Sequence, residues 1–244
     1  MEARQLAERL AKRADLTVTL SLAGRTTAPA AHPVPLRVGG FGGAEGLAAY
    51  LRDQRIDVLV DATHPYAVAI SANAAAAVPR ACVALLALRR VGWTPIPGDR
   101  WIEVADAAAA VQALGTIPRR VLLAVGRKAI APFANAPQHR YLVRSVEAIM
   151  PPLMVPHAVY ITGRGPFAEA DERALLEEYG IEVIVAKNSG GPATYGKIAA
   201  ARALGLPVVM LRRPSLPPAD AVASVDDAVA WLDHRCTLAA VRGV

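Results

Sequence analysis

The chain has 244 residues, of which 54% are hydrophobic and 20% charged, and this composition excludes an intrinsically disordered protein. No apolar run is long enough to span a bilayer and no secretory signal pattern is visible, so we expect a cytoplasmic protein. The formal net charge of +6 indicates either a basic surface without a specific role or an anionic ligand. Aromatic residues are 5% and are not interleaved with the basic ones, which argues against nucleic acid.

Helices and strands alternate from the first residues onward. The elements predicted for the first half are a helix over Glu2–Ala14, a strand over Thr17–Leu22, a helix over Ala44–Arg55, a strand over Ile56–Asp61, a helix over Tyr66–Val78, a strand over Ala81–Leu88 and a helix over Ala105–Leu114. A loop rich in Pro and Gly over Trp93–Arg100 and a linker over Gly115–Pro118 interrupt this pattern. Cys82 and Cys236 are too few for a disulfide framework, and we predict that both are buried.

The alternation restarts after the linker. The elements predicted there are strands over Arg120–Val125, Tyr141–Arg144, Val159–Thr162, Ile181–Ala186 and Pro207–Leu211, and helices over Phe167–Tyr179, Thr194–Leu204 and Val225–Ala240. Continuous apolar strands are typical of parallel sheets that are buried on both faces. The sequence therefore predicts an α/β fold with parallel sheets in two domains, residues 1–116 and 117–244.

Parallel sheets bind ligands beyond the carboxyl ends of their strands, and the first polar segment in such a place is Ser21–Thr27. In a dinucleotide fold this segment faces the adenosine ribose, where an Arg among hydroxyl groups accommodates a 2′-phosphate. Arg25 with Ser21 and Thr26 therefore favours NADP over NAD. The alternative is a polar surface loop.

The densest polar cluster at a strand end is Asp61-Ala62-Thr63-His64-Pro65-Tyr66. Pro65 is typical of the first turn of a helix. The cluster places His64 beside a ligand, as a hydrogen-bond donor or a proton source. The alternative is a capped turn without a further role.

The segment Lys187–Gly191 ends a later strand and combines small residues with a charge, while Lys197 follows in the next helix. This pattern indicates either an anion-binding loop or a Gly-rich turn near a solvated lysine. Arg127, Lys128 and Arg144 lie at other strand ends and suit a ligand with many carboxylates. Gly163–Ala168 matches G-x-G-x-x-A, which we interpret as an anion-receptive helix start only.

These segments together resemble the precorrin-6A reductase family of cobalamin biosynthesis. The resemblance lies in Asp61–Ala67 with Ser71 and Asn73-Ala74, in Ser21–Thr26, Val125–Lys128 with Phe133, Gly165–Phe167, Lys187–Gly191, Lys197–Ala201 and Arg213-Pro214. It extends in order over nearly the whole chain. The family begins with an apolar strand and a Gly-Gly-Thr turn before a Glu-Ala-Arg helix, whereas here Met1 directly precedes Glu2-Ala3-Arg4. The resemblance thus implies that this strand and turn are missing from the sequence.

The resemblance implies two Rossmann-like domains with the active site in the cleft between them, and NADPH-dependent reduction of one C=C bond of precorrin-6A to give precorrin-6B. We expect a monomer in which residues 1–116 bind NADPH and residues 117–244 bind the anionic tetrapyrrole substrate, without a metal, a membrane or nucleic acid. The site residues assigned are His64 as catalytic, Ser21, Gly24, Arg25, Thr26, Asp61 and Thr63 as cofactor-binding, and Arg127, Lys128, Arg144, Lys187, Ser189, Gly190 and Lys197 as substrate-binding. The alternatives are reduction of the cobalt-containing substrate and a non-catalytic tetrapyrrole- or nucleotide-binding protein.

Overall fold

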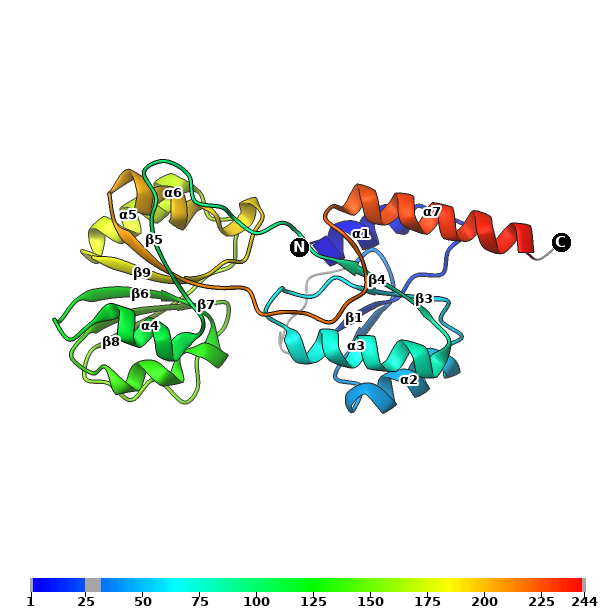
Figure 1. Ribbon diagram of the computed structural model, residues 1–244, viewed down its shortest axis with the longest axis horizontal. Helices are drawn as coiled ribbons and strands as arrows, with labels where there is room; N and C mark the ends of the chain where they lie inside the picture. Colours follow the sequence, from blue (N-terminus) through cyan, green and yellow to red (C-terminus); the bar gives the residue numbers. More distant parts are fainter. Residues whose placement is uncertain (1, 25–31, 243–244) are drawn as a thin grey trace. The chain divides into compact units, whose positions relative to one another are not determined.

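The computed structural model describes residues 2–24 and 32–242, and it divides into two compact units. Unit 1 combines residues 1–91 with 214–244, and unit 2 comprises residues 92–213. The chain therefore passes from unit 1 into unit 2 and returns. Figure 1 shows each unit with its own sheet and its own helices.

Unit 1 holds two small parallel sheets. Its strands are β1 (Leu20–Leu22) paired with β2 (Leu36–Val38), and β3 (Val58–Asp61), β4 (Ala84–Leu88) and β11 (Asp220–Val222) in the order β11-β4-β3. Its helices are α1 (Glu2–Leu10) and α7 (Val225–Arg242) on one face, and α2 (Gly43–Asp53) and α3 (Val68–Ala81) on the other (Figure 1). Among the described strands, β1 and β3 each have a single hydrogen-bonded neighbour.

Strand periodicity explains how both faces of unit 1 are covered. Val58 and Val60 of β3 pack into the cluster that α1 and α7 cover, whereas Leu59 packs into the cluster of α2 and α3. Successive side chains of a strand point to opposite faces, so an apolar run is buried between two helical layers. The carboxyl end of β3, where the chain emerges at Asp61, is thereby held firmly in place.

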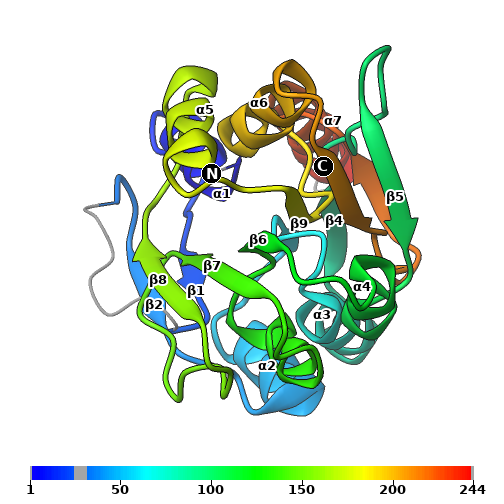
Figure 2. The same ribbon diagram turned by 90° about the vertical axis from the view of Figure 1, so that its left-hand side faces the viewer.

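Unit 2 contains one six-stranded, fully parallel sheet. Its strands are β5 (Arg100–Val104), β6 (Arg120–Ala124), β7 (Arg140–Ser145), β8 (Ala158–Thr162), β9 (Val183–Lys187) and β10 (Pro207–Leu211), in the order β5-β10-β9-β6-β7-β8. Helix α4 (Ala107–Leu114) lies on one face, and α5 (Glu169–Glu178) and α6 (Gly196–Ala203) lie on the other (Figure 2). Short 3-10 helices follow β6 at Arg127–Ala129 and Ala131–Asn135, and follow β9 at Pro192–Thr194.

The strand order of unit 2 reverses between β6 and β9. From β6 the chain proceeds outward to β7 and β8, then returns to form β9 and β10 on the other side of β6. Ala124 and Ala186 are paired across this boundary. Such a topological switch point is where open parallel sheets bind ligands, because the two following connections diverge to opposite faces.

The structure confirms the α/β class with parallel sheets and corrects three expectations. The units do not divide at residue 116, because β5 pairs with β10 in unit 2 and β11 pairs with β4 in unit 1. Strands β2, β5 and β11 were not predicted; two are only three residues long, and β5 is a largely exposed edge strand. Cys82 is exposed at the end of α3 rather than buried, and Cys236 is partly exposed.

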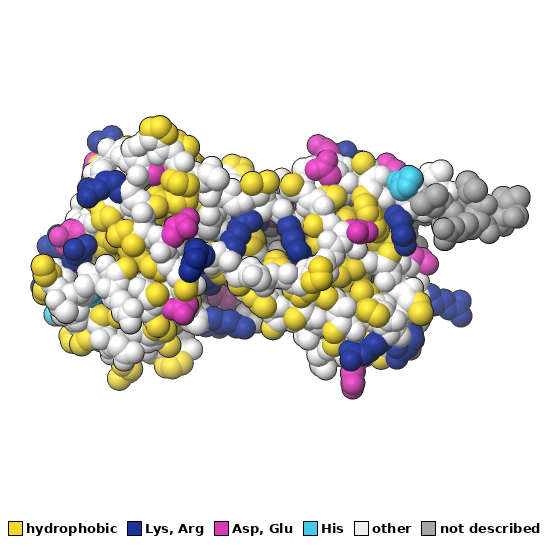
Figure 3. Space-filling view, viewed as in Figure 1, with side chains coloured by type: hydrophobic (Ala, Val, Ile, Leu, Met, Phe, Trp, Pro, Cys, Tyr) yellow, Lys and Arg dark blue, Asp and Glu magenta, His cyan; other side chains and the backbone are white. Residues whose placement is uncertain are grey.

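None of the described helices is long and apolar enough to cross a membrane. On the face shown in Figure 3, Lys and Arg side chains are interspersed with Asp and Glu side chains. The excess positive charge is therefore not gathered into one broad patch on that face, and specific strand ends have to be considered individually.

Candidate functional site

The switch point of unit 2 carries two lysines on neighbouring strands. Lys187 is the last residue of β9, and Lys128 lies in the 3-10 turn that directly follows β6. Burial, and then the positive charge of Lys128, lower the pKa of the Lys187 amine. Two cations that repel each other at a ligand-binding edge favour an anion as their common partner. Arg127, next to Lys128, is exposed on the same turn.

The loop after β9 turns on two consecutive glycines. Gly190 and Gly191 have positive φ values of 70° and 71°, which a residue with a Cβ atom rarely adopts. The Ser189 carbonyl accepts a hydrogen bond from Arg213 Nη2 (3.0 Å), and the Gly191 carbonyl accepts one from Trp93 Nε1 (2.8 Å). These bonds fix the direction of both carbonyl groups, and the first also fixes the direction of the Gly190 amide, which shares a peptide plane with the Ser189 carbonyl.

Arg144 and Glu172 form a buried, bidentate ion pair beneath this edge of the sheet. Arg144 Nη2 donates to Glu172 Oε2 at 2.7 Å, and Arg144 Nη1 donates to Glu172 Oε1. Their side chains are only 8% and 3% exposed. The guanidinium also lies over the ring of Phe167, with its carbon 4.4 Å from the ring centroid. The charge of Arg144 is thus compensated inside unit 2.

Lys197 is buried in the first turn of α6, only 4% exposed. Its Nζ donates to the Thr194 carbonyl (2.5 Å) and lies 5.0 Å from the centroid of the Trp93 ring. Burial, and then the nearby charge of Arg144, lower the pKa of Lys197 to about 7, although Glu172 opposes this shift. The lysine therefore supports the turn that begins α6.

The assignment of Arg144 and Lys197 as substrate contacts needs correction. Both side chains are enclosed in unit 2, where internal partners use their hydrogen-bonding groups. The sequence showed a cation at each strand end but not that these two were covered by Phe167 and Trp93. Of the other residues assigned to the substrate, Arg127 and Lys128 are exposed, Lys187 and Ser189 are partly exposed, and Gly190 is buried.

In unit 1, Asp61 organises the turn after β3. Its Oδ1 accepts from Thr63 N (3.1 Å) and Thr63 Oγ1 (2.7 Å), and its Oδ2 accepts from Ser71 Oγ (2.6 Å). The carboxylate is only 8% exposed. Three donors on one buried carboxylate make Asp61 the anchor that fixes Thr63 and the start of α3.

His64 is exposed on the same turn. Tyr66 N donates to His64 Nδ1 at 3.2 Å, and the two rings have centroids 5.6 Å apart. Because Nδ1 accepts, a neutral His64 carries its hydrogen on Nε2. The turn thus presents Nε2 as a donor, while the hydrogen bonds described for Asp61 go to Thr63 and Ser71.

The predicted 2′-phosphate segment is described only in part. Ser21 lies within β1 and Gly24 follows this strand, and both are exposed, whereas Arg25, Thr26 and Thr27 lie outside the described residues. Gly24 has a φ of +69°, and a Cβ atom there would lie 3.3 Å from the Cα of Gly39. The glycine therefore allows the ends of β1 and β2 to approach closely.

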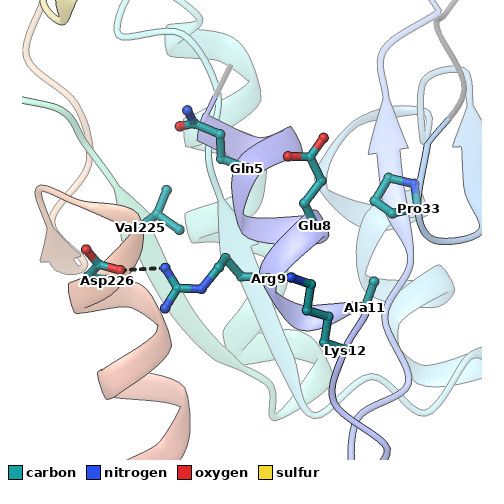
Figure 4. A pocket seen from close by; sticks show the side chains of 8 residues that line it. All are labelled: Gln5, Glu8, Arg9, Ala11, Lys12, Pro33, Val225 and Asp226. Carbon is teal, nitrogen blue, oxygen red and sulfur yellow. Dashed lines mark hydrogen bonds and ion pairs between the residues drawn. The ribbon is translucent and has the colours of Figure 1, made fainter.

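An open depression of about 820 Å³ lies between α1 and the start of α7 (Figure 4). The residues that line it are Gln5, Glu8, Arg9, Ala11, Lys12, Pro33, Val225 and Asp226. Arg9 and Asp226 form an ion pair of 2.7 Å across it. None of the predicted site residues lines this depression, and its mixed charges do not favour one class of ligand.

Two residues important to the site were missed from the sequence. Glu172 looked like one of several solvated acids at the start of a helix, together with Glu169 and Asp171. Trp93 was assigned to a Pro- and Gly-rich loop, with no local pattern that connects it to a segment almost 100 residues away. Only the three-dimensional structure brings these side chains to the edge of β6 and β9.

The family model described as Precorrin-6x reductase CbiJ/CobK matches residues 1–233. The chain belongs to this family. A Precorrin-6A reductase from Sinorhizobium sp is 54% identical over 96% of this chain and 89% of its own length. The protein of that name from Rhodobacter capsulatus is 46% identical over 97% of this chain and 94% of its own length.

The fold agrees with this family. A solved structure of CobK precorrin-6A reductase matches with a TM-score of 0.91 and 45% identity, over 96% of this chain and 93% of that one. The resemblance found in the sequence is confirmed, and with it the class of enzyme, an oxidoreductase of the corrin pathway. A reductase of this kind implies a nicotinamide cofactor, since no side chain carries a hydride.

Proposed function

We propose that this chain catalyses the NADPH-dependent reduction of one C=C bond of precorrin-6A, giving precorrin-6B. The observation that carries the proposal is a family match along nearly the whole chain, and the two lysines at the switch point of unit 2 support it. Both relatives described above bear the name Precorrin-6A reductase, which favours the metal-free substrate over the cobalt-containing one.

Unit 2 is assigned to the substrate, a macrocycle with many acetate and propionate groups. Lys128 and Lys187 provide charge for one carboxylate, and Arg127 provides charge beside them. The hydroxyl of Ser189 and the backbone of Gly190 provide neutral donors on the same loop. Relief of the repulsion between the two lysines makes carboxylate binding more favourable than either cation alone would.

Unit 1 is assigned to NADPH, with Ser21, Gly24, Arg25 and Thr26 at the 2′-phosphate. The described residues fit a nucleotide, because Gly24 presents bare backbone beside the hydroxyl of Ser21, and Thr63 adds a second hydroxyl at the end of β3. A bound NADPH supplies the hydride for the reduction. Asp61 holds Thr63 in place rather than offering a carboxylate of its own.

His64 is assigned to proton transfer. Saturating a C=C bond adds a hydride to one carbon and a proton to its neighbour. His64 presents Nε2 at an exposed turn whose backbone Asp61 fixes, and a positioned acid contributes typically about 10²–10⁴-fold to rate. The alternative roles for His64 are a contact with the cofactor or substrate, and structural support of the turn alone.

The open edges of β1 and β3 support the expectation of one more parallel strand in unit 1. In a doubly wound sheet with the order 3-2-1-4-5-6, strands β2-β1 and β3-β4-β11 occupy the two sides of the first strand. A further parallel strand between β1 and β3 would join the two small sheets. The test is the DNA upstream of the start codon, where an in-frame apolar segment ending in Gly-Gly-Thr supports the proposal.

The function is tested with precorrin-6A and NADPH, using the chain as given and a version extended by the upstream codons. Oxidation of NADPH together with a product heavier by two hydrogen atoms supports the proposal. Turnover only of the cobalt-containing substrate assigns the alternative reaction. Binding of precorrin-6A or NADPH without turnover by either version assigns a non-catalytic binding protein.

A further inference from the structure

The loop Asn188–Gly191 is held by residues at both ends of unit 2. The chain enters unit 2 at Gly92 and leaves it at Arg213. Asn188 Oδ1 accepts from Trp93 N (2.8 Å), and Asn188 Nδ2 donates to the Trp93 carbonyl (2.8 Å). The side-chain amide of Asn188 thus forms two hydrogen bonds with the backbone of Trp93, as a residue of a neighbouring β-strand would.

The leaving segment holds the same loop from the other end. Arg213 Nε donates to the Asn188 carbonyl (2.9 Å), and Arg213 Nη2 donates to the Ser189 carbonyl (3.0 Å). A Cβ on Gly92 would lie 3.4 Å from both the guanidinium carbon of Arg213 and Asn188 Oδ1. The two connections therefore meet at this loop, within hydrogen-bonding distance of it and in van der Waals contact with each other.

These bonds determine which side of the loop carries the free donors. A planar peptide directs its N–H opposite to its carbonyl, so a Ser189 carbonyl turned toward Arg213 turns the Gly190 amide away from it. Among the described residues, the Gly190 amide has no hydrogen-bond acceptor. Gly190 follows three residues after Lys187, whose charge is assigned to a substrate carboxylate.

We propose that Trp93, Asn188 and Arg213 are positioning residues for precorrin-6A, and that they couple occupancy of this loop to both connections of unit 2. The inference rests on the proposed function, since the anion at the loop is a carboxylate of that substrate. A carboxylate bound at Lys187 and the Gly190 amide stabilises the same loop conformation that the hydrogen bonds with Trp93 and Arg213 stabilise. Substrate binding therefore reduces local opening of the residues through which the chain enters and leaves unit 2.

The decisive variant is Arg213→Met, with Arg212→Met as its matched control. Arg212 is exposed, and its backbone N–H bonds to the Val104 carbonyl, so the control loses the same charge one residue away and keeps the loop contacts. We expect Arg213→Met to raise KM for precorrin-6A tenfold or more, with KM for NADPH within twofold of wild type. Asn188→Ala should show the same split, because it releases Trp93.

Hydrogen exchange provides a second measurement on the full-length protein. Precorrin-6A should slow exchange in peptides that contain residues 92–94 and 212–216 of wild type and of Arg212→Met, but not of Arg213→Met. Equal KM values for the two Arg variants, or parallel rises in both KM values with a lower Tm, overturn the positioning role. Unchanged exchange at both connections in wild type overturns the coupling. A wild type that does not turn over precorrin-6A overturns the proposed function and, with it, this inference.

Discussion

The buried pair of Arg144 and Glu172 makes a strong prediction about the stability of unit 2. Glu172→Gln keeps the shape of the side chain but leaves a guanidinium that is 8% exposed without its counter-charge. Breaking a buried ion pair from one side costs about 3–5 kcal/mol. Because the charge of Glu172 raises the pKa of Lys197, the substitution should also lower that pKa further, and we expect a loss of stability within this range.

The assay is urea unfolding followed by tryptophan fluorescence in a Trp231→Phe background. The chain has three tryptophans, and this background leaves Trp93 and Trp101, which both lie in unit 2. Glu177→Gln is the control, because its pair with Arg173 lies on the same helix but is about half exposed, and we expect a loss below about 1 kcal/mol.

A double variant completes the test of this pair. Arg144→Met with Glu172→Leu removes both charges and keeps an apolar volume, so it should recover most of the stability lost by Glu172→Gln. The reasoning is refuted if Glu172→Gln costs no more than Glu177→Gln. It is also refuted if the double variant loses as much as the two single variants added together.

Four further predictions concern pH, charge and chemistry. Folding lowers the pKa of Lys197 from 10.5 to about 7, so the unfolded chain binds more protons than the folded chain between these pH values. The free energy of unfolding should therefore rise with pH over this range. Lys197→Met should reduce this pH dependence in unfolding experiments. Lys128→Ala and Lys187→Ala should weaken binding of precorrin-6A, measured by titration, and leave NADPH binding nearly unchanged; normal substrate binding by both variants contradicts the assignment. The chain should prefer NADPH to NADH, and Arg25→Ala should lose about 1.5–3 kcal/mol, roughly ten- to a hundredfold, in NADPH affinity; equal affinity of wild type for both cofactors contradicts this. In single-turnover reactions His64→Ala and His64→Asn should both slow the chemical step about a hundredfold or more. Weaker ligand binding by the Ala variant that the Asn variant partly restores indicates that His64 contacts the ligand. A loss of stability with an unchanged chemical step indicates a structural role.

The sequence was informative where a signal is local. Apolar runs such as those of β6 and β9 predicted buried parallel strands, because burial on both faces requires apolar side chains at every position. The polar cluster at Asp61 predicted an organised turn at a strand end, and the structure places three donors on that carboxylate.

The remaining features depend on contacts between distant segments. Strand β5 is largely exposed and mixes charged with apolar residues, and only its pairing with β10 reveals that residues 92–114 belong to unit 2. The burial of Lys197 arises from Trp93, which precedes it by about 100 residues, and no local pattern reports such a contact. The sequence pattern therefore could not distinguish Lys187, which is partly exposed at the end of β9, from Lys197, which is buried in α6.

The most direct test of the central claim is transfer of deuterium to precorrin-6A from NADPH that carries deuterium at both hydrogens of the nicotinamide C4, followed by mass spectrometry of the product. Direct hydride transfer in unlabelled water predicts a product that carries one deuterium and one hydrogen from solvent. The same reaction with unlabelled NADPH in heavy water should also place one deuterium at a reduced carbon. A product without deuterium from labelled NADPH, or no reduced product from either the chain as given or its extended version, contradicts the assignment as a reductase of precorrin-6A.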